Sequence, residues 1–271
     1  MSLSLPRRAV LHALLPALTA SASAGFAAPS DARAAARPAG RPPAVAPRPA
    51  PLPAVAPAPL ERLFGRAVRT IPTSRRVMAL TFNAAWDDSG LDTVLTVLRQ
   101  QEARATFFLT GQFAERHPRA AHAIATAGHG LGNHSHTHPR FKALTPAERA
   151  AEVTLAQHAI RRAIGTEPLP FFRFPYGATS PARITEVNAM GFADIEWTTD
   201  TNGYKGLLGG MTVQKAVERA MDALRPGAIL QMHVGSLDGQ VPILDAQALP
   251  QIIDAVRTRG YEIADLRTLL V

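Results

Sequence analysis

The sequence predicts an α/β protein in which about six or seven parallel strands form a β/α barrel. From residue 75 onward, short apolar runs typical of strands alternate with stretches of helical periodicity. Strands that alternate with helices form parallel sheets. The units show no doubling, no internal repeat and no dinucleotide-binding glycine pattern, which favours a barrel with its site at the carboxyl ends of the strands.

The first two strands are predicted from apolar runs. Residues 77–82 read as a buried strand, and apolar residues recur with helical spacing between 91 and 98. Residues 105–109 predict the second strand, and a helical segment follows it and ends before Gly128. Each of these strands is therefore expected to lead into a loop and a helix.

A long helix is predicted from residue 145 to Gly165. Thr145 is an N-cap residue, Pro146 occupies the first helical position, and Glu148 completes a capping box. Gly165 provides the expected stop.

The remaining elements continue the alternation. Strands are predicted over residues 171–174, 192–197, 228–234 and 261–263, and helices over residues 180–191, 212–224 and 245–259.

Composition limits the chemistry. A chain of 271 residues with 46% hydrophobic residues can bury one core of about 200 residues and carry appendages, and we expect a monomer. The absence of cysteine excludes disulfides, a thiolate metal site, a cysteine nucleophile and a lipid-modified cysteine. Any metal must therefore be held by histidines and carboxylates.

Charge is concentrated near the N-terminus. Residues 1–74 carry nine arginines against Asp31 and Glu61, while the rest of the chain is nearly neutral. The basic N-terminal tail therefore favours contact with an anionic surface of the cell envelope, and no nucleic-acid partner is expected.

Residues 1–28 have the form of a secretory signal. Arg7 and Arg8 precede an apolar run over residues 9–20, and small residues follow at 22–24. The run is too short to span a bilayer comfortably, so we expect no stable transmembrane anchor. The protein is predicted to be secreted or to reside in the cell envelope.

Residues 29–74 are predicted to be a linker and a transitional segment. The stretch to Pro59 is almost entirely Ala, Pro and Arg, which cannot repay the entropy of folding. The folded domain is expected over residues 75–271, and residues 1–74 are expected to be dispensable for its stability; the alternative is that the transitional segment over residues 60–74 packs on the domain.

Three of the nine histidines fall within residues 134–138. His134 and His138 are four residues apart, so a helical turn or tight loop can aim both rings at one metal ion. His136 lies between them and is expected to point elsewhere. The alternative is a polar surface loop.

Polar or aromatic residues also stand where the other predicted strands end. Any one of these residues alone is weak evidence for a functional site, because such residues more often form turns or lie in the core with their hydrogen bonds satisfied. They are Asn83, Asp87 and Asp88 after the first strand, Arg173, Pro175 and Tyr176 after Phe172, Trp197 and Asp200 after the next strand, and His233 in the last sheet strand.

In this order, the motifs resemble those of the polysaccharide deacetylase family. The resemblance covers about residues 75–271. It implies a distorted β/α barrel with fewer than eight full units, and metal-dependent hydrolysis of an N-acetyl group on a sugar. The partner it implies is an N-acetylated glycan or peptidoglycan.

The resemblance also implies the metal ligands and the general acid. His134 and His138 match two ligands of zinc or a similar divalent metal, which would activate water and polarise the carbonyl. His233 matches the general acid that protonates the leaving nitrogen. Asp200 matches an aspartate that tunes this histidine, and the later Asp-Trp pair of that motif appears only as Gly203-Tyr204.

The walls of the groove are implied in the same way. Arg173 matches an arginine that orients the catalytic carboxylate. Pro175 and Tyr176 belong to the segment that forms one wall, and Trp197 belongs to the motif of Asp200, so these three are the expected substrate-binding residues.

The first motif departs from the family. The family has two adjacent aspartates, a general base and a third metal ligand, where this chain has Asn83 and Ala84. Either the site is degenerate, or Asp87 and Asp88 on a lengthened loop supply one or both of the missing carboxylates, at least one of them to the metal; their alternative function is to cap the following helix. Asn83 would still hydrogen-bond metal-bound water or the substrate amide.

Three functional hypotheses follow. The first is an exported, metal-dependent N-deacetylase of a carbohydrate polymer or peptidoglycan. The second is a catalytically degenerate glycan- or metal-binding relative at the cell envelope. The third is a hydrolase of another non-peptide C–N bond.

Overall fold

The computed structural model describes residues 59–237, 239 and 242–271. The expected signal over residues 1–28 and the linker as far as residue 58 lie outside the described residues. Within the described part of the chain, no helix combines the length and the hydropathy needed to cross a membrane.

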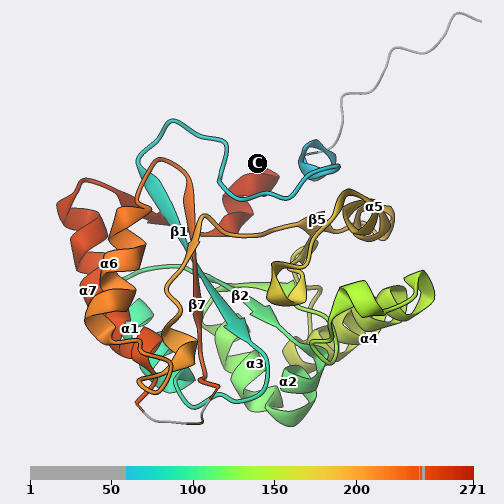
Figure 1. Cartoon of the computed structure of the whole chain (residues 1–271), viewed down its shortest axis with the longest axis horizontal. Helices are drawn as coiled ribbons and strands as arrows, with labels where there is room; N and C mark the ends of the chain where they lie inside the picture. Colours follow the sequence, from blue (N-terminus) through green and yellow to red (C-terminus); the bar gives the residue numbers. More distant parts are fainter. Residues whose placement is uncertain (1–58, 238, 240–241) are drawn as a thin grey trace, which may run out of the picture. The chain divides into compact units, whose positions relative to one another are not determined.

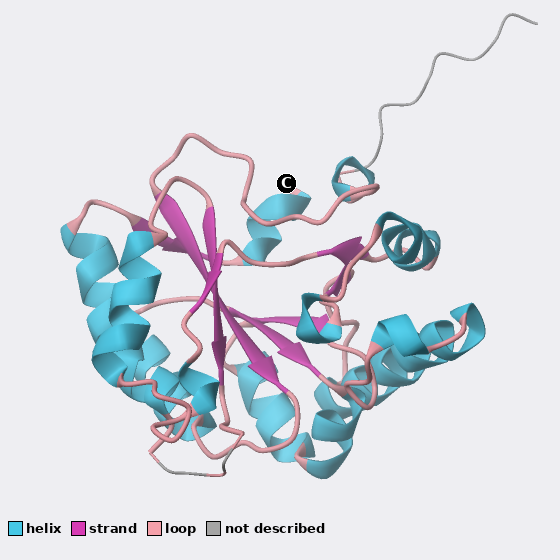
Figure 2. Ribbon diagram, in the orientation of Figure 1, coloured by secondary structure: helices cyan, strands magenta, loops and turns pink. Residues whose placement is uncertain are grey.

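One parallel sheet forms the centre of the fold (Figures 1 and 2). Seven strands follow the order β5-β4-β3-β2-β1-β7-β6, and β8 pairs with the first residues of β1. The strands are β1 (Val77–Ala84), β2 (Thr106–Leu109), β3 (Gly130–Asn133), β4 (Phe171–Phe172), β5 (Ala193–Asp194), β6 (Thr199–Asp200), β7 (Ala228–His233) and β8 (Glu262–Ala264). The curled sheet forms a half-barrel, which confirms the predicted α/β class and the distorted, incomplete barrel.

Seven α-helices surround this sheet within the described residues. They are α1 (Leu91–Gln100), α2 (Gly111–Arg116), α3 (Pro118–Thr126), α4 (Pro146–Ile164), α5 (Pro181–Ala189), α6 (Val213–Asp222) and α7 (Leu244–Thr258). Figure 1 shows α1, α6 and α7 grouped on one flank and α2, α3 and α4 on another.

The central strand β1 has every residue buried, and its two faces pack into different clusters. Leu80 and Phe82 belong to the larger cluster, which includes the buried faces of the helices. Ala79 belongs to a smaller cluster with Phe108 and Ile229 inside the curl of the sheet. Because both faces are covered, the strand reads as a continuous apolar run, which is why the sequence predicted it.

Helix α4 begins and ends as predicted. The Thr145 side chain accepts the backbone N–H of Glu148, the Glu148 carboxylate accepts that of Thr145, and Gly165 has a left-handed conformation with φ of 77°. One helical segment was expected before Gly128, but the structure has two helices there. Pro118 starts the second helix, α3, after α2 has ended. Strand β3 was not predicted at all.

The segment over residues 60–71 belongs to the folded domain, so the expected boundary at Arg75 is wrong. Leu63, Val68 and Ile71 are buried in the cluster inside the sheet. Val68 N–H donates to Asp194 O at 2.9 Å, and Ile71 N–H donates to Gly227 O at 2.8 Å. The segment thus joins the region of β5 to the start of β7. The apolar residues at 60, 63, 64, 67, 68 and 71 have helical spacing, but only residues 61–63 form a helical turn, so the spacing did not predict how the segment packs.

We therefore predict that a truncated chain beginning at Arg75 is much less stable than one beginning at Ala54. Burial of Leu63, Val68 and Ile71 contributes about 1.5–3 kcal/mol for each side chain, so the free energy of unfolding should fall by several kcal/mol. Urea unfolding of the two chains measures the difference. Equal unfolding midpoints would show that the segment adds nothing to the core.

Candidate active site

A cavity of about 310 Å³ lies where the strands end at their carboxyl side. Its lining includes residues that follow or end β1, β3, β4, β6 and β7: Asn83, Ala85, Trp86, His134, His138, Phe174, Tyr176, Trp197, Asp200, Tyr204, Gln231, His233 and Leu237. Most of the predicted site residues are therefore brought together, as expected for parallel strands.

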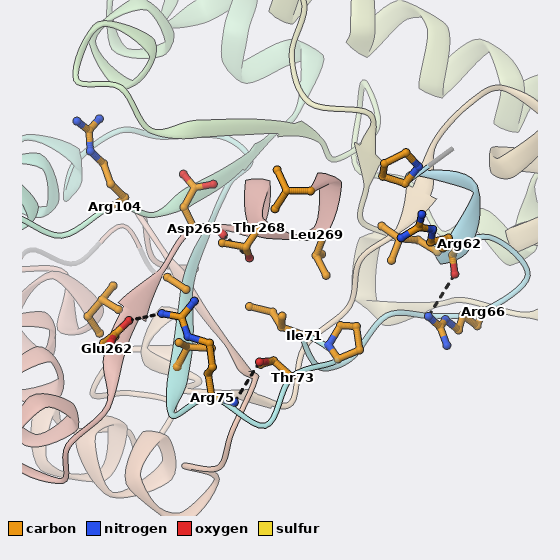
Figure 3. A pocket seen from close by; sticks show the side chains of 17 residues that line it. Arg62, Arg66, Ile71, Thr73, Arg75, Arg104, Glu262, Asp265, Thr268 and Leu269 are labelled. Atoms are coloured by element: carbon orange, nitrogen blue, oxygen red, sulfur yellow. Dashed lines mark hydrogen bonds and ion pairs between the residues drawn. The ribbon is translucent and has the colours of Figure 1, made fainter. Parts of the chain in front are cut away.

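A larger cavity of about 710 Å³ lies at the opposite end of β1 (Figure 3). Val77 at the start of β1 and residues 262–265 around β8 line it, together with Arg62, Arg75 and Arg104. No histidine and no predicted site residue is part of its lining. The smaller cavity is therefore the candidate active site.

His134 and His138 face each other at this cavity. Their ring centroids are 4.8 Å apart, and the rings meet edge to face at 73°. Burial lowers the pKa of His134 well below its usual value, and the neighbouring His138 lowers it further. Burial and then His233 lower the pKa of His138 to about 4. Both rings are neutral at pH 7, the state that binds metal ions.

The loop after β3 fixes these two rings. His134 Nδ1 lies 2.8 Å from Arg173 O, so Nδ1 carries the proton and Nε2 keeps its lone pair. Ser135 and His138 have left-handed backbones with φ of 67° and 58°. Ser135 Oγ accepts the N–H of His138 at 3.1 Å, which holds the tight turn. Strained residues of this kind gather at functional sites.

His136 points away from the pair, as the sequence predicted. Its Nε2 lies 3.8 Å from Glu115 Oε2. Its Nδ1 packs so closely on Gly111 that a Cβ added there would lie 2.1 Å away. His136 therefore packs against α2 and is a suitable control position.

Arg173 is fully buried and holds several strands in register. Its Nε donates to Ile195 O at 2.9 Å, and one terminal nitrogen donates to both Thr81 Oγ1 and Asn83 Oδ1 at 3.0 Å. The other terminal nitrogen donates to Glu196 O at 3.2 Å. Burial lowers the pKa of Arg173 to about 10, so the side chain remains charged at neutral pH. Arg173 thus orients Asn83, the residue that stands where the family places a carboxylate.

Asn83 is the centre of a polar network at the floor of the cavity. Its Nδ2 lies 3.2 Å from Gln231 Oε1 and 3.5 Å from His233 Nε2. Gln231 Nε2 donates in turn to Asp200 Oδ2 at 2.8 Å. Asp200 is therefore occupied by Gln231, a residue that sequence reasoning passed over.

His233 contacts the carboxylate of Asp245, which the sequence did not single out. Asp245 Oδ2 accepts the backbone N–H of His233 at 2.8 Å and lies 3.8 Å from His233 Nδ1. Asp245 is fully buried at the start of α7. The contact expected between Asp200 and His233 is thus replaced by one from a different element.

Gly203 makes room for this carboxylate. A Cβ on Gly203 would lie 2.1 Å from Asp245 Oδ1. The position where the resemblance implies an aspartate therefore has no side chain, and the carboxylate of Asp245 fills that space. The only sequence signal was the missing Asp-Trp pair, which does not indicate where a replacement would come from.

Asp87 and Asp88, the expected metal ligands, have other partners. Asp88 Oδ2 lies 3.1 Å from His117 Nδ1, and Asp87 Oδ1 accepts the N–H of Ser89 at 3.1 Å. Asp87 lines a small recess beside His233 and packs against Gly235. Neither contact involves His134 or His138.

The described residues do not fit a catalytic zinc centre with three protein ligands. Among them, no group of three or more histidine or carboxylate side chains is arranged to hold a metal ion. The methyl group of Ala84, where the family has its third ligand, is buried in the helix-side core. The structure provides two neutral imidazoles, and catalytic zinc sites use three protein ligands.

Aromatic side chains form the upper walls of the cavity. The rings of Trp86 and Tyr176 lie 4.9 Å and 4.7 Å from that of His138, and both side chains are largely exposed. Trp197 lines the cavity as expected, whereas Pro175 is buried in the turn that carries Tyr176. The ring of Tyr204 lies 4.3 Å from that of His233. Trp86 and Tyr204 were not predicted as site residues.

Comparison with known proteins identifies the family. The polysaccharide deacetylase profile matches residues 70–195. The chitooligosaccharide deacetylase of Bradyrhizobium sp. is 31% identical over 202 residues, which cover 72% of this chain and 90% of the relative. The chain belongs to the polysaccharide deacetylase family. A peptidoglycan-N-acetylglucosamine deacetylase of Bacillus cereus is 28% identical, covering 73% of this chain and 70% of the relative.

Solved structures of polysaccharide deacetylases share the fold. A CE4 family pseudoenzyme from Bacillus anthracis superposes with a TM-score of 0.70 at 27% identity, covering 78% of this chain and 71% of that chain. A mutant of the same protein is described as having restored enzymatic activity. The family therefore includes both active deacetylases and a relative that lacks activity.

A pair of buried acids lies next to Arg173 and away from the cavity lining. Asp194 and Glu196 are fully buried, and Thr179 Oγ1 donates to Asp194 at 2.8 Å. Burial, and then the neighbouring Glu196, raise the pKa of Asp194 to about 8. Burial also raises the pKa of Glu196, although Arg173 opposes that shift.

We predict that Asp194→Asn changes how stability depends on pH. Between pH 3.8 and about 8 the unfolded chain loses the Asp194 proton and the folded chain keeps it, so the wild type loses stability as pH rises. The variant lacks this loss. As pH rises, its free energy of unfolding should therefore increase relative to that of the wild type, by up to about 1.4 kcal/mol per pH unit. Urea unfolding at pH 5, 6 and 7 measures this, with the exposed Asp254→Asn as control. A constant difference between Asp194→Asn and wild type would contradict the assignment.

Proposed function

We propose that this protein is an exported hydrolase that removes N-acetyl groups from a carbohydrate polymer or from peptidoglycan at the cell envelope. The observation that carries the proposal is the shared cavity, in which His134, His138 and His233 meet a wall of aromatic side chains. Chitooligosaccharide and peptidoglycan deacetylases among its relatives support the substrate class. The form of residues 1–28 supports export.

The aromatic wall is suited to a sugar. Trp86 and Tyr176 are 43% and 56% exposed beside the histidines, so their faces are available to the apolar side of a pyranose ring. Arg140 lies 4.7 Å from the centre of the Tyr176 ring and steadies it. A glycan held there places an acetamido group above Asn83 and His233, and His233 is the group that moves a proton to the leaving nitrogen.

His134 and His138 are the residues that would hold a divalent cation such as zinc. Their lone pairs are available, because both rings are neutral at pH 7. No carboxylate joins them in the described part of the chain, so we expect weak binding.

We predict that His134→Ala and His138→Ala each abolish zinc binding, whereas His136→Ala leaves it unchanged. The first two substitutions each remove one of only two donors, and the third alters a ring that packs on α2. Isothermal titration with zinc measures the affinities of the three variants and the wild type. Equal losses in all three variants, or no difference from wild type in any, would contradict the assignment.

A glycan-binding protein without hydrolytic activity is the second candidate. The specific observation that favours it is Asn83-Ala84, because Asn cannot accept a proton and Ala cannot bind a metal. The pseudoenzyme among its structural neighbours shows that loss of activity occurs on this fold. The aromatic wall would serve binding equally well.

Acetate release distinguishes the two candidates. We predict that the full chain releases acetate from N-acetylglucosamine oligomers or from peptidoglycan, and that His233→Ala lowers the rate by about 10²–10⁴-fold. His136→Ala is the matched control and should retain the wild-type rate. If the wild type binds these glycans but releases no acetate from any, the deacetylase function is wrong and the binding function is supported.

A further inference from the structure

The cavity lacks the carboxylate base that the family uses, so another group must accept the proton of the attacking water. Asn83 cannot accept one. Asp200 lines the cavity, but each of its oxygens accepts a hydrogen bond at 2.8 Å, from Gln231 Nε2 and from the N–H of Asn202, whereas the contact at His233 Nε2 is the longer 3.5 Å one with Asn83 Nδ2. Asp87 lies in the neighbouring recess that Asn83 and His233 also line, but its Oδ1 accepts the N–H of Ser89 at 3.1 Å and its carboxylate packs against Gly235. His233 is the remaining candidate beside Asn83.

The hydrogen bonds around Asn83 determine which nitrogen of His233 carries a proton. Arg173 has only donors, so the Asn83 atom that it contacts must be Oδ1. The Asn83 Nδ2 group therefore faces Gln231 Oε1 and His233 Nε2 as a donor. Gln231 agrees with this orientation, since its own Nε2 donates to Asp200. An N–H donor opposite His233 Nε2 requires that this nitrogen be an acceptor.

The other side of the ring meets a carboxylate. With Nε2 unprotonated, a neutral His233 carries its proton on Nδ1, and Asp245 Oδ2 lies 3.8 Å from that atom. Asp245 is held in place by the N–H of His233 at 2.8 Å. His233 Nδ1 is buried without a hydrogen-bond partner in the described residues, and a small movement of the ring would bring it within hydrogen-bond distance of Asp245 Oδ2.

We propose that His233 Nε2 is the proton acceptor for the hydrolytic water in this protein, and that Asp245 is the positioning residue that holds its ring in the Nδ1–H tautomer. This inference rests on the proposed deacetylase function. It differs from the expected mechanism, in which a carboxylate takes the proton and the histidine serves as the acid.

The reaction is balanced with this one histidine. Water takes the place of the long Asn83 contact at His233 Nε2 and gives a proton to that nitrogen as its oxygen bonds to the acetyl carbon, and the carbonyl becomes an oxyanion. The imidazolium faces the Asp245 carboxylate, which stabilises its charge. His233 then returns the proton from Nε2 to the amide nitrogen, the C–N bond breaks, and acetic acid and a free amine leave, between which the acid proton then passes to give acetate and an ammonium.

The test begins with the ring tautomer, which does not depend on activity. In the full chain labelled with ¹⁵N-histidine, the His233 ring, assigned by loss of its signals in His233→Gln, should show a protonated Nδ1 and an unprotonated Nε2 when neutral. Asn83→Asp places a carboxylate oxygen opposite Nε2 and should shift the proton to that nitrogen. An Nε2–H ring in the wild type would overturn the inference.

Kinetics then test Asp245. Asp245→Asn should lower kcat by about 10²-fold or more with little change in KM, because proton transfer is impaired and the sugar contacts remain. Asp265→Asn is the matched control, because Asp265 is also a buried carboxylate at a helix start but lines the opposite cavity (Figure 3). It should leave kcat unchanged. An unchanged kcat and tautomer in Asp245→Asn would refute the positioning role.

The two readouts separate this inference from the proposed function. A chain that releases acetate while its neutral His233 carries the proton on Nε2 would refute the inference alone. A chain that shows the Nδ1–H ring but releases no acetate would refute the deacetylase function, and the proton-acceptor role with it.

Discussion

The burial of Arg173 is the constraint on which the rest of the site depends. A buried guanidinium needs acceptors for its donors, and here four hydrogen bonds reach Thr81 and Asn83 on β1 and the carbonyls of residues 195 and 196. Its own carbonyl accepts the proton of His134. One residue therefore sets the position of the central strand, the orientation of Asn83 and the tautomer of a candidate metal ligand.

This constraint gives the substitution at position 83 a physical meaning. An aspartate there would accept from Arg173 but would meet Gln231 Oε1 as a second acceptor. Asparagine has one acceptor for Arg173 and donors for Gln231 and His233, so every contact has the correct polarity. Asn83 and Gln231 are thus matched to each other, and the hydrogen-bond network around position 83 is suited to the side-chain amide of asparagine.

The sequence predicted those helices and strands that carry a clear local pattern, such as a capping residue or a continuous apolar run. The capping box at Thr145 and the apolar run of β1 were sufficient for α4 and the central strand. Strand β3 was missed because Gly130 and Gly132 have low strand propensity, yet Gly132 is required where a Cβ would lie 2.8 Å from the Phe108 ring. The spacing of the histidine pair left a metal site and a polar surface loop both open, and the other motifs decided between them. Asp245 was not, because it comes from a helix that follows the last site motif.

The network also explains why restoring the family's aspartate is not a simple reversal. With a carboxylate at position 83, Gln231 would have to turn its amide to donate to it, and its oxygen would then face the Asp200 carboxylate. A third ligand at Ala84 would enter the helix-side core, where a charge has no partner. The arrangement of Asn83, Gln231, His233 and Asp245 is therefore self-consistent, and any one member constrains the other three. A return to the family's chemistry requires several of these residues to change together.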